Sequence, residues 1–146
     1  MSDHNSDEFE LSRFVAAQEL NYSVALQELR QGKKESHWMW FIFPQIEGIG
    51  YSQIARHFAI SCTSEASAYL MHPLLGQRLR ECCEAVLAVE NKTALEIFGP
   101  PDDMKLHAFA TLFSYVSPTG SVFHQIIDKY FAGKKHMKTI SCLEAN

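Results

Sequence analysis

The sequence predicts an all-α fold, a single compact multihelical domain of six or seven helices. Apolar residues recur with helical spacing in most segments, no segment shows the alternation typical of strands, and glycine or proline separates the segments at short intervals. The chain has 146 residues, of which 47% are hydrophobic and 21% charged, as in an ordinary globular domain. We therefore expect a flexible acidic tail at residues 1–8 and one helical domain at residues 9–146.

The first helical segment spans residues 9–31 and stops at Gly32, a residue typical of helix ends. Gln18 falls on the apolar face of this segment. It is either a core amide with satisfied hydrogen bonds or a group that faces a pocket. The apolar residues that define the face are Leu11, Phe14, Val15, Tyr22, Ala25, Leu26 and Leu29.

An unbroken block of large apolar residues, 38–43, follows and contains both tryptophans of the chain. Periodicity does not decide between a buried strand and a buried helical turn for six such residues. The block is expected to end extended, because Phe43 precedes Pro44. If the whole block is extended, Trp38 and Trp40 share one side, and the other side holds His37, Met39 and Phe41.

The remaining helices are predicted from their start and stop residues. Ser52 and Ser64 suit helix N-caps, Pro73 suits a first helical turn, and Gly99 and Gly133 suit helix ends. The expected helices follow Ser52 and then cover residues 65–71, 73–90, 93–98, 102–116 and 122–131, with a last turn at 139–143.

Composition excludes several classes of protein. The net charge of -4 argues against binding nucleic acid by bulk electrostatics, and no apolar run reaches the ~18–20 residues of a membrane span. The acidic N-terminus does not resemble a signal peptide, and four cysteines without a Cys-x-x-Cys pair suit reduced thiols. The seven histidines include no His-x-x-x-His pair. We expect a cytoplasmic protein with no metal site and no cofactor.

No strong catalytic motif is present, so the sequence leaves open whether the protein is an enzyme. Glycine-rich phosphate loops and the Gly-x-Ser-x-Gly elbow are both absent. One group of candidate ligand-binding residues combines cationic, aromatic and amide side chains around the apolar block: Lys33, Lys34, His37, Trp38, Trp40 and Gln45. For the lysines, the alternative is a solvated pair after a helix.

Two further groups supply acid or base candidates. The first of these groups, Asp102, Asp103 and Lys105, lies at the start of the helix expected from residue 102, where both aspartates also suit the helix N-terminus without any site. Asp103 and His107 are one turn apart, a spacing that suits an acid–base pair but is more often a surface contact. Glu65 and His72 form the last pair, and the His72 ring is equally suited to capping the helix at Pro73.

Several strings resemble the DUF1810 family over nearly the whole chain after the tail. They include Gly48-Ile49-Gly50-x-Ser52, Glu65-Ala66-x-Ala68-Tyr69-Leu70-x-His72-Pro73, Asp103-x-Lys105-Leu106 and above all Ser36-His37-Trp38-Met39-Trp40-Phe41-Ile42-Phe43-Pro44-Gln45. The resemblance implies a predominantly helical single domain and no established activity. The Tyr69-Leu70-x-His72-Pro73-x-Leu75 helix start is also faintly similar to the YbiA-like NADAR family, which implies chemistry on N-glycosidic bonds.

Two functional hypotheses follow. In the first, the protein binds a small phosphorylated or nucleotide-derived ligand, such as an ADP-ribose-like molecule, and hydrolyses an N-glycosidic bond if it is an enzyme. Aromatic rings stack the ligand, lysines meet phosphate, Gln18 or Gln45 orients a polar group, and Glu65, His72 or Asp103 supplies the acid or base. In the alternative, the chain is a non-enzymatic helical module that binds another protein. A homo-oligomer is compatible with either.

Overall fold

The computed structural model describes residues 7–145, which form ten α-helices rather than the six or seven predicted. Two changes account for most of the difference: the segment expected as one helix divides into two, and the apolar block contributes a helical turn. The helices are α1 (Ser12–Gln18), α2 (Tyr22–Gln31), α3 (Met39–Ile42), α4 (Gln53–His57), α5 (Thr63–Met71), α6 (Pro73–Ala88), α7 (Ala94–Phe98), α8 (Asp102–Ser114), α9 (Val122–Phe131) and α10 (Met137–Ala145).

The break between α1 and α2 has a local cause. The Asn21 side-chain amide donates to the backbone oxygen of Ala17 at 2.7 Å, and so competes with the helical hydrogen bonds of this turn. The helix then restarts at Tyr22 and ends, as predicted, at Gly32, which has a φ of 75°. Of the predicted acidic tail at 1–8, residues 1–6 lie outside the described residues. Asp7 accepts hydrogen bonds from the Ser12 amide and hydroxyl.

Several predicted helix ends are confirmed. The Ser52 hydroxyl accepts from the Ala55 amide at the start of α4, and α7 stops at Gly99, as predicted. Thr93, expected as the first residue of its helix, instead caps α7 and forms a capping box with Glu96. The Ser64 cap was wrong, because α5 begins one residue earlier, at Thr63, after Cys62. The last turn expected at 139–143 is a longer helix, α10.

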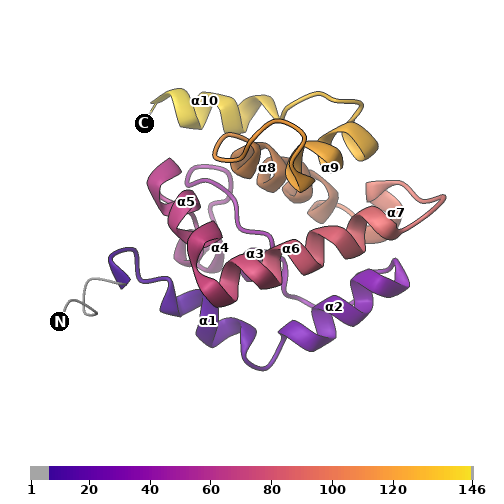
Figure 1. Cartoon of the computed structure of the whole chain (residues 1–146), viewed down its shortest axis with the longest axis horizontal. Coiled ribbons are helices and arrows are strands. Elements are labelled where there is room, and N and C mark those ends of the chain that lie inside the picture. The colour runs from indigo at the N-terminus through magenta and orange to yellow at the C-terminus, as the bar shows by residue number, and fades with distance from the viewer. Residues whose placement is uncertain (1–6, 146) are drawn as a thin grey trace.

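The helices pack as one compact domain around α6 (Figure 1). Helix α6 crosses the middle of the view and packs against α2, α5 and α9, while α8 packs against α7, α9 and α10. Aromatic rings fill the space between these layers, for example Phe43 with its ring centroid 4.7 Å from that of Phe109. None of the helices in residues 7–145 is both long and apolar enough to cross a membrane.

A short backbone pairing fixes the segment that follows the apolar block. The Ile60 amide donates to the Gln45 oxygen at 2.9 Å, and the Glu47 amide donates to the Ile60 oxygen at 2.8 Å. This isolated parallel bridge joins the chain after Pro44 to the chain after α4. The bridge holds α4 beside α3, and these two helices form the wall of the candidate site.

Candidate functional site

Helical geometry separates the two tryptophans. Each residue of a helix turns by about 100°, so residues two apart point to opposite sides. Trp38, just before α3, is 1% exposed, whereas Trp40, inside α3, is half-buried. The block is therefore not extended throughout, and Trp38 and Trp40 do not share one side. Trp40 is the one residue of the block 38–43 that reaches the surface, and the candidate site is built around it.

Glu28 holds the segment that leads into α3. Its carboxylate accepts hydrogen bonds from the amides of Glu35 and Ser36, from the Ser36 hydroxyl at 2.6 Å and from the Trp38 indole at 2.8 Å. Burial alone would raise the pKa of Glu28, but these donors outweigh burial and lower the pKa to about 2. Glu28 therefore stays ionised and fixes the backbone that positions Lys34 and Trp40.

Two lysines meet at Asp102, the first residue of α8. Lys34 Nζ lies 2.8 Å from Asp102 Oδ2, and Lys105 Nζ lies 3.6 Å from Asp102 Oδ1. The Lys105 ammonium also lies over the Trp40 ring, 5.1 Å from its centroid, and Lys34 lies over the Trp38 ring at 5.0 Å. The structure thus brings together two predicted lysines and both predicted tryptophans, with Asp102 as the shared partner.

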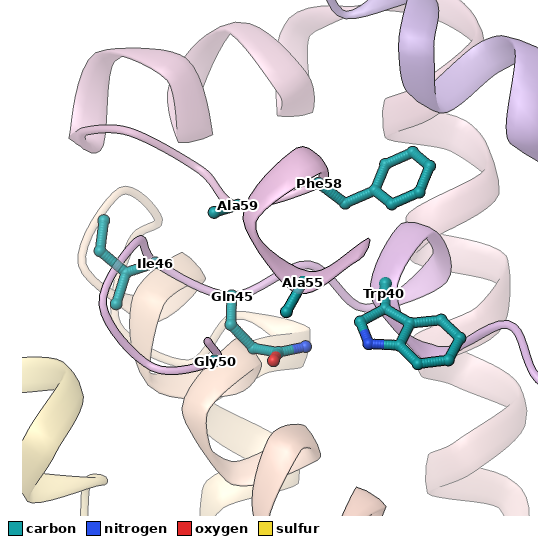
Figure 2. A pocket seen from close by; sticks show the side chains of 7 residues that line it. All are labelled: Trp40, Gln45, Ile46, Gly50, Ala55, Phe58 and Ala59. Carbon is teal, nitrogen blue, oxygen red and sulfur yellow. The ribbon is translucent and has the colours of Figure 1, made fainter. Parts of the chain in front are cut away.

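On its other side, Trp40 borders a small pocket between α3 and α4 (Figure 2). The Gln45 side chain extends into the middle of this group and donates to the Phe43 oxygen at 2.6 Å. The pocket holds about 10 Å³, room for roughly one water molecule. Its lining residues are Trp40, Gln45, Ile46, Gly50, Ala55, Phe58 and Ala59. A ring-sized ligand would lie on the exposed face of Trp40 rather than inside this pocket.

The pocket wall is held by close packing and by a partly buried ion pair. A Cβ atom at Gly50 would lie 2.7 Å from the Ala55 Cβ, so only glycine lets the two segments approach this closely. Arg13 donates to the Ala59 oxygen at 2.9 Å and to Glu65 at 2.7 Å. The predicted acid Glu65 is thus buried behind the wall, where it also accepts from Ser61.

Gln18 is a buried amide beneath α3. It donates to the Phe41 oxygen at 2.8 Å and to the Tyr69 hydroxyl at 3.1 Å, and its oxygen accepts from Arg78 at 3.3 Å. Of the two interpretations that the sequence left open, the structure therefore favours the satisfied core amide. Gln18 supports the end of α3 from inside and does not border the pocket of Figure 2.

Three other predicted residues, His72, Lys33 and His37, do not line the pocket beside Trp40. His72 caps α6, since its Nδ1 accepts from the amides of Leu74 and Leu75 at 3.2 Å. Lys33 and His37 are exposed. Asp103 adjoins Asp102, and its Oδ1 atom is buried without a hydrogen-bond partner among the described residues.

Sequence reasoning missed Glu28, and it grouped Asp102 with Asp103 and Lys105 without giving Asp102 a catalytic or binding role. The Asp102–Lys105 pair has the i,i+3 spacing of helix neighbours and was detectable in the sequence. The role of Glu28 was not, because its donors follow 7 to 10 positions later in a loop. Residues 7–145 contain no group of three or more histidine, cysteine or acidic side chains that could hold a metal ion.

The family assignment rests on a match over most of the chain. The model of the DUF1810 family, described as a protein of unknown function, matches residues 8–143. The chain belongs to the DUF1810 family. A comparison with curated proteins found no match.

A solved structure has the same fold as this DUF1810 protein. It is the crystal structure of the conserved hypothetical protein Rv1873 from Mycobacterium tuberculosis, with 44% sequence identity and a TM-score of 0.93. The match covers 96% of this chain and 100% of the Rv1873 chain. The comparisons therefore establish the family and the fold of this chain.

Proposed function

We propose that this protein binds a small anionic molecule that carries a flat ring, of the nucleotide or ADP-ribose class, at the exposed face of Trp40. The observation that supports this most directly is the pairing of Trp40 with a lysine. Lys105 lies over the Trp40 ring, and its ammonium lies 3.6 Å from Asp102. An ion pair at this distance is weak, so the ammonium can exchange Asp102 for a ligand anion.

The parts of the site match the parts of such a ligand. An indole face stacks a planar ring, and an ammonium pairs with phosphate. Gln45, which borders the same tryptophan, supplies an amide that can orient a polar group of the ring. In this proposal the ligand ring displaces Lys105 from the indole face, and the lysine then turns to the ligand anion.

We extend the proposal to one reaction, N-glycosidic hydrolysis. Water adds to the anomeric carbon, the bond to the ring nitrogen breaks, and the base leaves with a proton. Such a step needs an acid or base beside the sugar, and the start of α8 offers Asp102, between two ammonium groups, and Asp103, with one buried unpartnered oxygen. Glu65 and His72 are occupied by Arg13, Ser61 and the start of α6.

A calorimetric and thermal-shift panel tests the binding proposal. Wild-type protein is titrated with ADP-ribose, NAD, nucleotides and sugar phosphates, beside Trp40→Ala and Lys105→Met. A ligand at 100 times its Kd adds about 2.7 kcal/mol to the free energy of unfolding, a shift in Tm of a few degrees. Both variants should lower affinity about tenfold or more while remaining folded.

The chain offers a matched control for that panel. Lys135 lies 4.6 Å from the centroid of the Tyr115 ring, which is the same type of lysine–aromatic pair at a different place. Tyr115→Ala should leave ligand affinity unchanged. A panel with no binder, or equal losses in Trp40→Ala and Tyr115→Ala, would rule out the Trp40 site. Release of free base from a bound ligand, abolished in Asp102→Asn, would support the hydrolytic step.

A reducing compartment completes the proposal. All four cysteines are free thiols. Burial raises the pKa of Cys82 to about 12 and also raises the pKa of Cys83 well above its usual range, so neither forms a reactive thiolate near neutral pH. These features suit a cytoplasmic protein, as the sequence suggested.

A further inference from the structure

A second surface, separate from Trp40, lies between α8 and the C-terminal helix α10. It is a groove of about 650 Å³ that combines exposed apolar and basic side chains. Met104 is 51% exposed and Met137 is 73% exposed, and Ile140 of α10 also lines the groove. No residue of this groove lines the Trp40 pocket.

The charge of the groove is opposite to that of the chain as a whole. Lys134, Lys135 and Lys138 line it within five positions, in a protein of net charge -4. No acidic residue lines the groove, and none of the three lysines makes an ion pair in the part of the chain that the structure describes. This surface therefore presents positive charge that residues 7–145 leave unneutralised.

The lysines alone supply that charge near neutral pH. His107 and His136 also line the groove, and burial lowers the pKa of both rings. The His107 ring stacks on Phe131, with centroids 4.0 Å apart, and its Nε2 lies 2.6 Å from the Lys134 oxygen. These contacts hold the Lys134 backbone at the rim of the groove.

We propose that this groove binds an acidic segment of a partner protein that carries apolar anchor residues. Exposed methionines are flexible and adapt to apolar side chains of different shape. The lysines at the rim pair with carboxylates that flank those anchors, and so provide orientation and a faster association rate. A nucleic acid would use the lysines but not the methionines, and the acidic remainder of the chain would repel it.

Selection from a random 16-residue peptide library displayed on phage tests the proposal, with Lys134→Glu protein used for counter-selection. The enriched peptides should share acidic residues next to leucine, phenylalanine or tryptophan. The strongest peptide is then synthesised with a fluorescent label and titrated with each protein variant by anisotropy.

Two matched pairs of variants separate the groove from general effects of charge or exposed methionine. Lys134→Glu should weaken peptide binding about tenfold or more, whereas Lys33→Glu, the same charge reversal at another exposed lysine, should change it less than twofold. Met137→Ala should weaken binding about fivefold, and Met71→Ala, at another exposed methionine, should not.

Three outcomes would overturn the proposal. In the first, the enriched peptides lack acidic residues; in the second, they bind Lys134→Glu as well as wild type. In the third, labelled oligouridine or vesicles with phosphatidylserine bind through Lys134 while no peptide does, and the surface is then a site for nucleic acid or lipid. Because Lys33 and Trp40 are absent from the groove, failure of this proposal leaves the Trp40 proposal untouched.

Discussion

Trp38 and Trp40 have the same side chain two positions apart, yet their surroundings differ. Trp38 is buried and donates its indole N–H to Glu28 at 2.8 Å. Trp40 is half-buried, and no protein acceptor for its indole N–H occurs among residues 7–145. A buried tryptophan with a satisfied N–H contributes to stability, whereas a half-exposed one without a partner is free to contact a ligand. We therefore expect substitutions at Trp38 and its contacts to lower the free energy of unfolding. Substitutions at Trp40 and its contacts should instead lower ligand affinity.

The largest effect should come from Glu28→Gln. A neutral amide replaces a carboxylate that accepts four hydrogen bonds, and hydrogen bonds to a buried charge are stronger than neutral ones. We expect the free energy of unfolding to fall by about 3–4 kcal/mol, measured by urea denaturation. Glu35→Gln, at an exposed acid seven positions later, is the control and should cost less than about 0.5 kcal/mol. Equal losses would mean that Glu28 is not a special support.

Acid should remove the same contribution from the wild-type protein. The pKa of Glu28 is about 2 in the folded protein and near 4.5 in the unfolded chain, so its stabilisation is complete above pH 4.5 and is lost as the pH falls toward 2. The two values correspond to about 3 kcal/mol. Urea denaturation between pH 6 and pH 2.5 measures the free energy of unfolding of wild type and of Glu28→Gln. The difference between the two proteins should become smaller as the pH falls. A constant difference would contradict the lowered pKa.

Substitution of each tryptophan by phenylalanine tests the comparison directly. Trp38→Phe leaves a cavity and removes one donor to Glu28, and should cost about 2–3 kcal/mol. Trp40→Phe keeps an aromatic ring at a half-exposed position and should cost less than about 1 kcal/mol. Equilibrium unfolding of both variants, with ligand titration of each, gives the two readouts. If Trp40→Phe proved the more destabilising, the division between folding and binding would be wrong.

Local rules predicted most helices, because caps and prolines act within a few residues. Ser52 is an N-cap and Pro73 begins α6, as expected from the sequence alone. The split at Asn21 was missed, since a side-chain contact to the preceding turn replaced a helical hydrogen bond there. Helix count was therefore less predictable than helical character.

The candidate site was less predictable, because long-range contacts decide it. Six consecutive apolar residues fit a strand or a helix equally well. The helical turn that forms is held by a long-range contact, because Gln18 donates to the oxygen of Phe41, 23 positions later in the chain. That turn separates Trp38 from Trp40. Lys34 and Lys105 were both candidates from the sequence. Lys105 reaches Asp102 within α8, but only the packing of α8 against the segment before α3 brings Lys34 to the same carboxylate.

The smallest expected effects on stability distinguish the two lysines that contact Asp102. The Lys34 side chain is 7% exposed, lies 2.8 Å from Asp102 and also donates to the Ser36 oxygen, so Lys34→Met should cost about 1–2 kcal/mol. Lys105 is more exposed and lies 3.6 Å from the same carboxylate, so Lys105→Met should change the free energy of unfolding by less than about 0.5 kcal/mol.

Ligand titration should invert that order if Trp40 is the binding face. Lys105→Met removes the ammonium over the indole and should weaken binding about tenfold, while Lys34→Met, whose lysine lies over buried Trp38, should act mainly through stability. Calorimetry at a temperature where both variants are folded measures the affinities. A larger loss of affinity in Lys34→Met would indicate that the ligand binds beside Lys34, on the other side of Asp102, and not at the Trp40 face.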